Sequence, residues 1–177
     1  MRTSIRSQLE DDHESLGQLL AELDAELAKP NIAPAVELLD LFWAHLAVHI
    51  RAENLHLFAA LANVPASLFA GRSGLPTSEG AHTVLLRLRS DHDFFMKELA
   101  ITIKAARLIA GLKVASPKET KELRQRFTTI AKRLEVHNLL EEEQSYVWPS
   151  LLFDDQTLTR LCDRVRHELE NLPPRFS

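Results

Sequence analysis

The sequence is poor in the residues that cross-link a chain or interrupt its helices. Its 177 residues include one cysteine, Cys162, and five glycines. A single cysteine excludes an internal disulfide, which suits a reducing compartment. Few glycines, and the lack of alternating polar and apolar residues, argue against a sheet. We therefore expect a helical protein, long enough to bury a core of its own.

The sequence also lacks a basic surface, a long apolar run and a secretory signal, and each of these absences excludes a class of protein. The formal net charge is −4, so no basic surface for nucleic acid is expected. No apolar run approaches the roughly 18 residues of a membrane-spanning helix. The first residues lack the apolar stretch of a secretory signal. These absences favour a cytoplasmic protein that binds neither nucleic acid nor membrane.

Apolar residues recur every three or four positions through most of the chain, which is the period of amphipathic helices. Short connections between such helices predict an all-α fold, an antiparallel up-down four-helix bundle with a short fifth C-terminal helix. The four bundle helices and the fifth helix are expected at residues 4–29, 35–62, 81–110, 117–152 and 155–171.

Local signals place several helix ends. Residues 63–80 contain three glycines and two prolines and are expected to form a loop, with or without a short helical turn in it. Ser116, Pro117 and Glu119 resemble a capping box at the start of the fourth helix. That helix is expected to stop or kink near Pro149, because proline cannot continue the hydrogen-bonding pattern of a helix interior.

A histidine stands at an inward position of all four long helices, and a glutamate follows it on two of them, where leucine is expected. An internal repeat relates them: "DHESL" at residue 12 resembles "DHDFF" at residue 91, and "HIRAE" at 49 resembles "HNLLE" at 137. Residues four apart share one face of a helix, so each His-x-x-x-Glu pair points at one place. The candidate site residues are His13, His49, Glu53, His92, His137 and Glu141.

These residue types predict a centre for two divalent cations. Four imidazoles and two carboxylates would meet inside the bundle, and a buried unpaired carboxylate costs several kcal/mol. Two cations remove that cost. Each would take two imidazole nitrogens, while the carboxylates can bridge a metal pair about 3.5–4 Å apart. Nitrogen and carboxylate ligands suit non-haem iron or manganese, with zinc as a further possibility.

The order His, His-x-x-x-Glu, His, His-x-x-x-Glu is similar to that of the hemerythrin-like, or HHE cation-binding, family. The resemblance spans about residues 5–152 and is carried by the six candidate site residues. The "EEEQSYVWPSL" stretch from Glu141 also follows the family's aromatic-Pro-x-Leu ending. This resemblance implies a hemerythrin-like bundle with metal ligands at the six positions. It further implies two iron ions with an oxo, hydroxo or water bridge.

Two positions depart from the oxygen carriers of that family. Met96 stands where those proteins are expected to have a further histidine, and Glu142 stands where they use an aspartate. One nitrogen ligand fewer leaves more open coordination. We therefore expect a protein that binds, senses or reacts with O₂, peroxide or nitric oxide, or handles iron, rather than a reversible oxygen carrier. Di-iron redox activity stays open, and no protein partner is indicated.

Two other interpretations stay open at this point. The Glu-x-x-His signature of ferritin-like di-iron carboxylate proteins occurs at His13, His56 and His82, but it leaves the remaining inward histidines unexplained. The second interpretation is a metal-free helical interaction module with hydrogen-bonded buried histidines. Such a module would hold no metal, and its stability would be indifferent to chelators.

Residues next to the candidate ligands are expected to have structural roles. Asp12 and Asp91 directly precede His13 and His92, so they point about 100° away from them and are expected at caps or on the surface. His45 lies near the edge of the inward face and is expected to have a structural role or to donate a hydrogen bond to a ligand.

Overall fold

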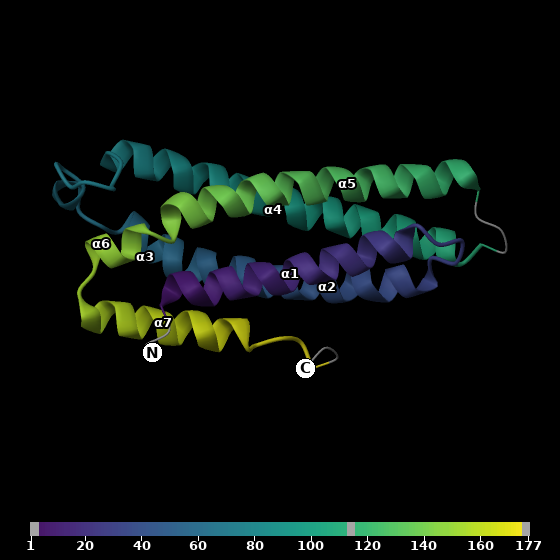
Figure 1. The fold of residues 1–177 in the computed structure, drawn as a ribbon, viewed down its shortest axis with the longest axis horizontal. Helices are drawn as coiled ribbons and strands as arrows, with labels where there is room; N and C mark the ends of the chain where they lie inside the picture. Colours follow the sequence, from purple (N-terminus) through teal and green to yellow (C-terminus); the bar gives the residue numbers. More distant parts are fainter. Residues whose placement is uncertain (1–3, 113–115, 175–177) are drawn as a thin grey trace.

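The computed structural model of the protein describes residues 4–112 and 116–174, and these contain helices and no strand. The predicted all-α fold class is thus confirmed. Four long helices lie side by side along the long axis of the molecule (Figure 1). Each packs against its neighbours in a closed ring around one interior, in the order α1, α2, α4, α5 and back to α1. Their bounds are Ile5–Leu27 for α1, Ala33–Ala52 for α2, Ser78–Ala110 for α4 and Pro117–Leu140 for α5.

Helices α2 and α5 each run into a π-helical turn that begins at the glutamate of a His-x-x-x-Glu motif. The turn η1 (Glu53–Leu57) leads from α2 into α3 (Phe58–Ala62), and η3 (Glu141–Ser145) leads from α5 toward α6 (Trp148–Leu152). The sequence predicted one continuous helix over 35–62 and a helix over 117–152 that stops or kinks near Pro149. The break in the second of these precedes Pro149, which lies in the first turn of α6, where a missing N–H is harmless.

Side-chain caps set several helix starts. The Thr77 hydroxyl accepts a hydrogen bond from the Gly80 N–H at 3.0 Å, so α4 begins at Ser78, three residues before the expected start. The loop before it contains a short 3₁₀ turn, η2 (Ala66–Leu68). The predicted capping box of α5 is present: the Ser116 hydroxyl accepts from the Glu119 N–H at 3.2 Å, and the Glu119 carboxylate accepts from the Ser116 N–H at 3.1 Å.

The C-terminal helix α7 (Asp155–Leu169) lies against α1 and α2 at the end of the bundle that holds α3 and α6 (Figure 1). Leu161 and Val165 are buried on its inner face. An ion pair between Arg51 on α2 and Glu168 on α7 links its last turn to the bundle. The fifth helix expected from the sequence thus packs on the bundle, and it ends two residues before the expected bound.

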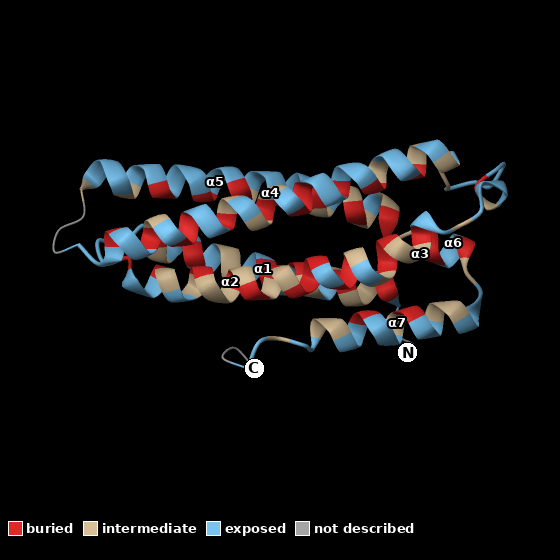
Figure 2. Cartoon of the chain, turned by 180° about the vertical axis from the view of Figure 1, so that it is seen from behind, coloured by how far each residue is buried: buried red, intermediate tan, exposed pale blue. Residues whose placement is uncertain are grey.

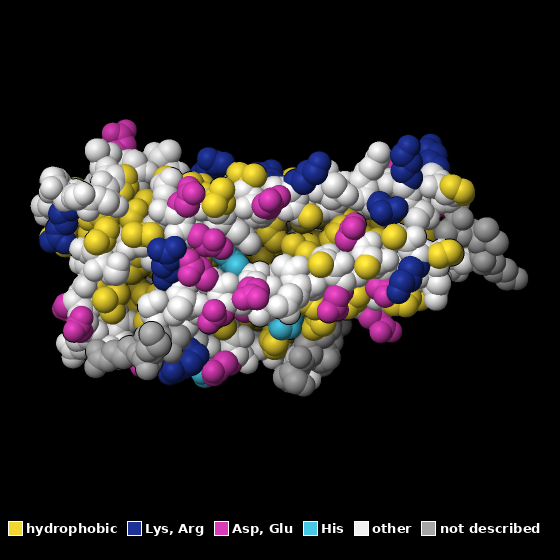
Figure 3. All heavy atoms as spheres, in the orientation of Figure 1, with side chains coloured by type: hydrophobic (Ala, Val, Ile, Leu, Met, Phe, Trp, Pro, Cys, Tyr) yellow, Lys and Arg dark blue, Asp and Glu magenta, His cyan; other side chains and the backbone are white. Residues whose placement is uncertain are grey.

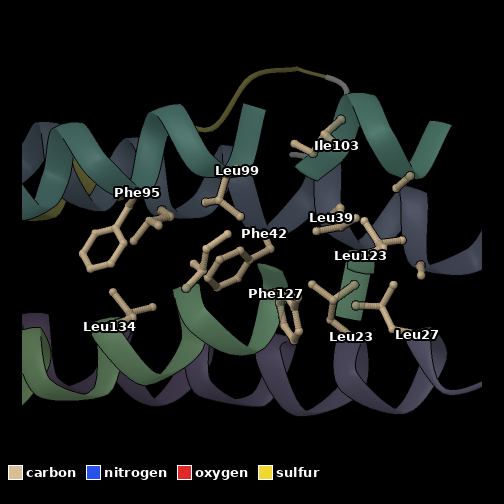
Figure 4. Packing of buried hydrophobic residues seen from close by; sticks show 14 of the residues in the cluster. Leu23, Leu27, Leu39, Phe42, Phe95, Leu99, Ile103, Leu123, Phe127 and Leu134 are labelled. Atoms are coloured by element: carbon tan, nitrogen blue, oxygen red, sulfur yellow. The ribbon is translucent and has the colours of Figure 1, made fainter. Parts of the chain in front are cut away.

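The bundle interior consists of two apolar clusters with a polar layer between them. Buried residues line the inward faces of the long helices (Figure 2). One cluster fills the end near the α1–α2 turn and includes Leu39 and Phe127 (Figure 4). The other fills the end beneath α7 and includes Leu9 and Trp148. Each fully buried side chain of this size stabilises the fold by about 1.5–3 kcal/mol.

Within the described residues, one helical stretch, Ala33–Ala62, is long and apolar enough to cross a membrane by length and composition. Its inward side carries His49 and Glu53 and packs on α1 and α4, so its apolar character is that of a core helix. The face of the molecule in Figure 3 has acidic and basic side chains interspersed among apolar ones.

Candidate metal centre

The six candidate ligands form the polar layer between the two apolar clusters. On each long helix, the side chains one turn before and after the histidine belong to different clusters: Leu9 and Leu16 flank His13, for example. The six side chains are all buried, and the two carboxylates have no exposed surface. Four helices therefore deliver their histidines to one level of the bundle, and η1 and η3 begin there with the glutamates.

Two groups of potential ligand atoms share both carboxylates. The first group is His13, His49, Glu53 and Glu141, and the second is Glu53, His92, His137 and Glu141. In each group, one ligand atom from every residue lies within 4.8 Å of all the others. This arrangement fits two ions that share two carboxylates.

The imidazole Nε2 atoms converge pairwise in these groups. Nε2 of His13 lies 3.1 Å from Nε2 of His49, and Nε2 of His92 lies 3.1 Å from Nε2 of His137. Glu53 Oε2 lies 3.4 Å from His49 Nε2 and 3.2 Å from His92 Nε2, so one carboxylate oxygen faces both groups.

Glu141 joins the two groups in the same way through both of its oxygens. Its Oε1 lies 3.1 Å from His137 Nε2 and 3.6 Å from His92 Nε2, and its Oε2 lies 3.4 Å from His13 Nε2. Glu53 Oε2 and Glu141 Oε1 are buried and have no hydrogen-bond partner among the residues that the structure describes. A buried oxygen without a hydrogen-bond partner destabilises an apolar interior. Together with the converging nitrogens, they form a donor set that fits divalent cations.

Without metal, protons balance the charge of this layer. Burial alone would lower the pKa of His92, but the close, negatively charged carboxylates of Glu141 and Glu53 raise that pKa to about 9. Burial would also lower the pKa of His49. Glu53 and Asp12 outweigh this effect, so the pKa of His49 lies well above its ordinary value. Two imidazolium charges can thus face two carboxylates, which is the charge balance that bound cations would otherwise provide.

The same charges act on the two glutamates in the opposite direction. Burial would raise the pKa of Glu141, but the imidazoles of His137, His13 and His92 outweigh it, so that pKa lies well below its usual value. The pKa of Glu53 is also lowered, by His49 and His92 against burial and the repulsion of Glu141. Both carboxylates are therefore ionised at neutral pH and available as ligands.

Carboxylates behind the imidazoles orient three of the four rings. Asp12 accepts a hydrogen bond from His49 Nδ1 at 2.7 Å, and Glu142 accepts one from His13 Nδ1 at 2.8 Å. An ionised carboxylate only accepts, so a proton lies on Nδ1, and in the neutral ring the Nε2 lone pair points inward. Asp12 belongs to neither ligand group, as expected, but the cap or surface role expected for it is wrong, because its carboxylate holds His49. Asp12 directly precedes His13 on α1, and its side chain therefore turns toward the adjacent helix α2.

Asp91 repeats this arrangement in the second half of the chain. It lies 3.4 Å from His137 Nδ1 and is itself held by Arg133 at 2.5 and 2.8 Å. Its side chain is buried, so the cap or surface role expected for it is also wrong. The signal was present in the repeat, where an Asp-His pair begins both "DHESL" and "DHDFF".

Tyr146 is a residue of the centre that the sequence analysis missed. Its side chain is buried, and its hydroxyl donates a hydrogen bond to Glu53 Oε1 at 2.6 Å. Burial, with the adjacent Glu141 and Glu53 charges, raises the pKa of Tyr146 well above its ordinary value. The spacing of five residues after Glu141 concealed it, because that spacing does not share a face in a regular α-helix.

The other histidines do not join this cluster. His56 lies 3.5 Å from Glu168 on α7, and His82 is exposed. The structure therefore does not assemble the Glu-x-x-His residues of the ferritin-like interpretation into one site. His45 is half-buried and is in neither group of potential ligands.

Asp12→Ala is expected to weaken metal binding by about 10–100-fold, because His49 loses the partner that fixes its ring and tautomer. Asp11→Ala is the matched control, since Asp11 is exposed on the same turn of α1. Competition titration of the metal-free protein against a chelator measures both affinities. Equal affinities for the two variants would show that the Asp12–His49 contact does not support binding.

Comparison with known proteins places the chain in a family. The family model of the hemerythrin HHE cation binding domain matches residues 4–148, a span that contains all six candidate ligands and Tyr146. No curated protein and no solved structure matches the sequence. The match covers most of the chain and agrees with a helical fold that carries two buried His/Glu groups. The chain belongs to the hemerythrin HHE cation-binding domain family.

Proposed function

We propose that this chain is a non-haem di-iron protein built on an antiparallel up-down four-helix bundle. Its centre binds, senses or reacts with O₂, peroxide or nitric oxide, or handles iron. The observation that carries the proposal is the pair of buried ligand groups that share Glu53 and Glu141. Manganese and zinc are the alternative metals, since imidazole and carboxylate ligands also suit them.

In this proposal, His13 and His49 hold one ion and His92 and His137 hold the other. Glu53 and Glu141 would serve both, which explains why two carboxylates with no exposed surface carry oxygens without a hydrogen-bond partner in the described part of the chain. Four neutral imidazoles and two carboxylates bring a charge of −2 to two cations. The remaining positive charge favours anionic or strongly polarisable small ligands.

The chain also holds these side chains in place and keeps water away from them. Asp12, Glu142 and Asp91 hold three imidazoles with Nε2 directed inward. Phe58 stacks on the His92 ring at 5.6 Å, and Phe95 meets the His137 ring edge-on at 5.1 Å. When bound, two ferrous ions would supply the electrons for the two-electron reduction of a small oxidant.

Metal content per chain tests the proposal. Protein purified anaerobically without an affinity tag is expected to contain about two irons per chain by plasma mass spectrometry. Exposure of that sample to O₂, peroxide and nitric oxide, followed by absorption, would then separate sensing from turnover. A chain that binds no metal after reconstitution with Fe(II) would overturn the proposal in favour of a helical interaction module.

A further inference from the structure

The hydroxyl of Tyr146 occupies the interior of the first ligand group. It lies 2.6 Å from Glu53 Oε1 and 3.1 Å from His13 Nε2. It also lies 3.4 Å from both His49 Nε2 and Glu141 Oε2. One phenol oxygen thus contacts an atom of every residue in that group, and Tyr146 is the only tyrosine in the chain.

These contacts exceed what a hydroxyl can satisfy. Asp12 and Glu142 bind the Nδ1 protons of His49 and His13, so in the neutral rings that metal binding requires, both Nε2 atoms direct lone pairs toward the hydroxyl. A tyrosine hydroxyl has one proton to donate, and Glu53 accepts it at the shortest distance. With neutral rings, the other contacts bring lone pairs to the same oxygen. A cation among them would turn this repulsion into ligation, with the phenol oxygen as one more donor.

A π turn brings the Tyr146 side chain into the first ligand group. In a regular α-helix, the residue five positions after Glu141 would point about 140° away from it. Instead, the Tyr146 N–H donates to the Glu141 carbonyl oxygen at 2.9 Å, which closes a wider turn and returns Tyr146 to the same face. Such π turns are frequent at functional sites.

The first half of the chain contains a corresponding π turn, which places a different side chain. The turn η1 begins at Glu53, and the N–H of Phe58, five residues later, donates to the Glu53 carbonyl oxygen. Phe58 then stacks on His92 in the second ligand group. The two halves therefore present a phenol to one group and a phenyl ring to the other, so the two groups differ by one oxygen donor.

We propose that Tyr146 is a metal ligand, and that it makes the two metal positions of this centre unequal. The position of His13 and His49 takes the phenol oxygen as a further hard donor, which favours a harder, more highly charged ion there. The position of His92 and His137 has one protein donor fewer and is the more open of the two. This inference rests on the proposed function, since it requires metal in the centre.

Resonance Raman and visible absorption of the oxidised, iron-loaded protein test this ligand. Phenolate bound to ferric iron gives charge-transfer absorption and phenolate ring vibrations, and a single tyrosine makes their origin unambiguous. We expect both signals in the wild-type protein. Tyr146→Phe should lose them while it still binds iron, with a tenfold or greater loss of affinity at one of its two metal positions.

A second variant keeps the tyrosine count constant. Phe153→Tyr, made in the Tyr146→Phe background, places a phenol at a half-buried position at the end of α6 and should not restore the signals. Iron-loaded wild-type protein without phenolate vibrations would overturn the Tyr146 ligand and leave the di-iron proposal intact. A wild-type chain that binds no iron would overturn both. Circular dichroism of each variant checks that the bundle remains folded.

Discussion

Glu141→Ala is expected to abolish binding of both metal ions, whereas Glu143→Ala should retain both. Glu141 faces each ligand group through its two oxygens, at 3.1 Å from His137 Nε2 and 3.4 Å from His13 Nε2. Its removal takes a charge and a donor from both positions at once. Glu143 lies two residues away on the same turn but is exposed, so its removal leaves the centre unchanged.

Glu142→Ala separates ligation from orientation on this turn. Glu142 contacts the outer nitrogen of His13 but belongs to neither ligand group, so its loss is expected to weaken binding by about 10–100-fold without abolishing it. The series Glu141, Glu142, Glu143 should therefore give abolished, weakened and unchanged binding. Metal content and competition titration measure the three variants.

Folding of Glu141→Ala needs a separate check. Removal of one partner from a buried ion pair destabilises a protein by about 3–5 kcal/mol, so loss of metal and loss of structure must be distinguished. Glu141→Gln keeps the shape of the side chain and removes its charge. A folded Glu141→Gln variant, by circular dichroism, that still binds two metals per chain would contradict the role proposed for this carboxylate.

Metal removal is the second change with a large expected effect. A ligand at 1,000 times its Kd stabilises the folded state by about 4.1 kcal/mol. For a domain of this size, each kcal/mol shifts Tm by about 2–4 °C, so a chelator is expected to lower Tm by about 8–16 °C at neutral pH. An interaction module without metal would show no change.

The stability of the metal-free protein is expected to fall as pH rises. The pKa of His92 is raised to about 9, and that of His49 is raised too, so their protons stabilise the folded chain. That contribution is complete below the ordinary histidine pKa of about 6.5 and is lost as pH rises toward 9. The lowered pKa values of Glu53 and Glu141 act on the acid side, where stability falls below about pH 4.5.

The metal-loaded protein is expected to show the opposite dependence. Metal and protons compete for the same imidazole nitrogens, so metal binding strengthens as pH rises. The difference in Tm between metal-loaded and metal-free protein should therefore widen from pH 6 to pH 9. Thermal unfolding at both limits measures it. His82→Ala, at an exposed position, should keep this widening, and His92→Ala should reduce it.

Parallel pH profiles for the two forms would mean that the buried histidines do not exchange protons for metal. A control at fixed ionic strength is required, because surface ion pairs such as Arg107 with Asp40 also vary with conditions. Those exposed pairs contribute little to stability and are present in both forms. Their effect should therefore cancel in the difference between the two Tm values.

The sequence by itself determined the helical fold class and the residues that meet at the centre. Apolar residues at helical spacing identify the inward faces, and a histidine on such a face must lie in the interior whatever the neighbouring helices are. The pairs His49 with Glu53 and His137 with Glu141 follow from the geometry of one helix, because residues four apart share a face. The order of these residues also identified the family.

Tertiary structure alone decided how the ligands are supported. Asp12 turns toward His49 on the adjacent helix, and this contact depends on the relative rotation and height of α1 and α2. No period within a single helix encodes those two quantities. Tyr146 reaches the centre only because a π turn replaces a regular one after Glu141, and α-helical spacing directs it elsewhere. Single-helix geometry thus specified the six candidate ligands found in the sequence, and packing between helices specified their hydrogen-bond partners.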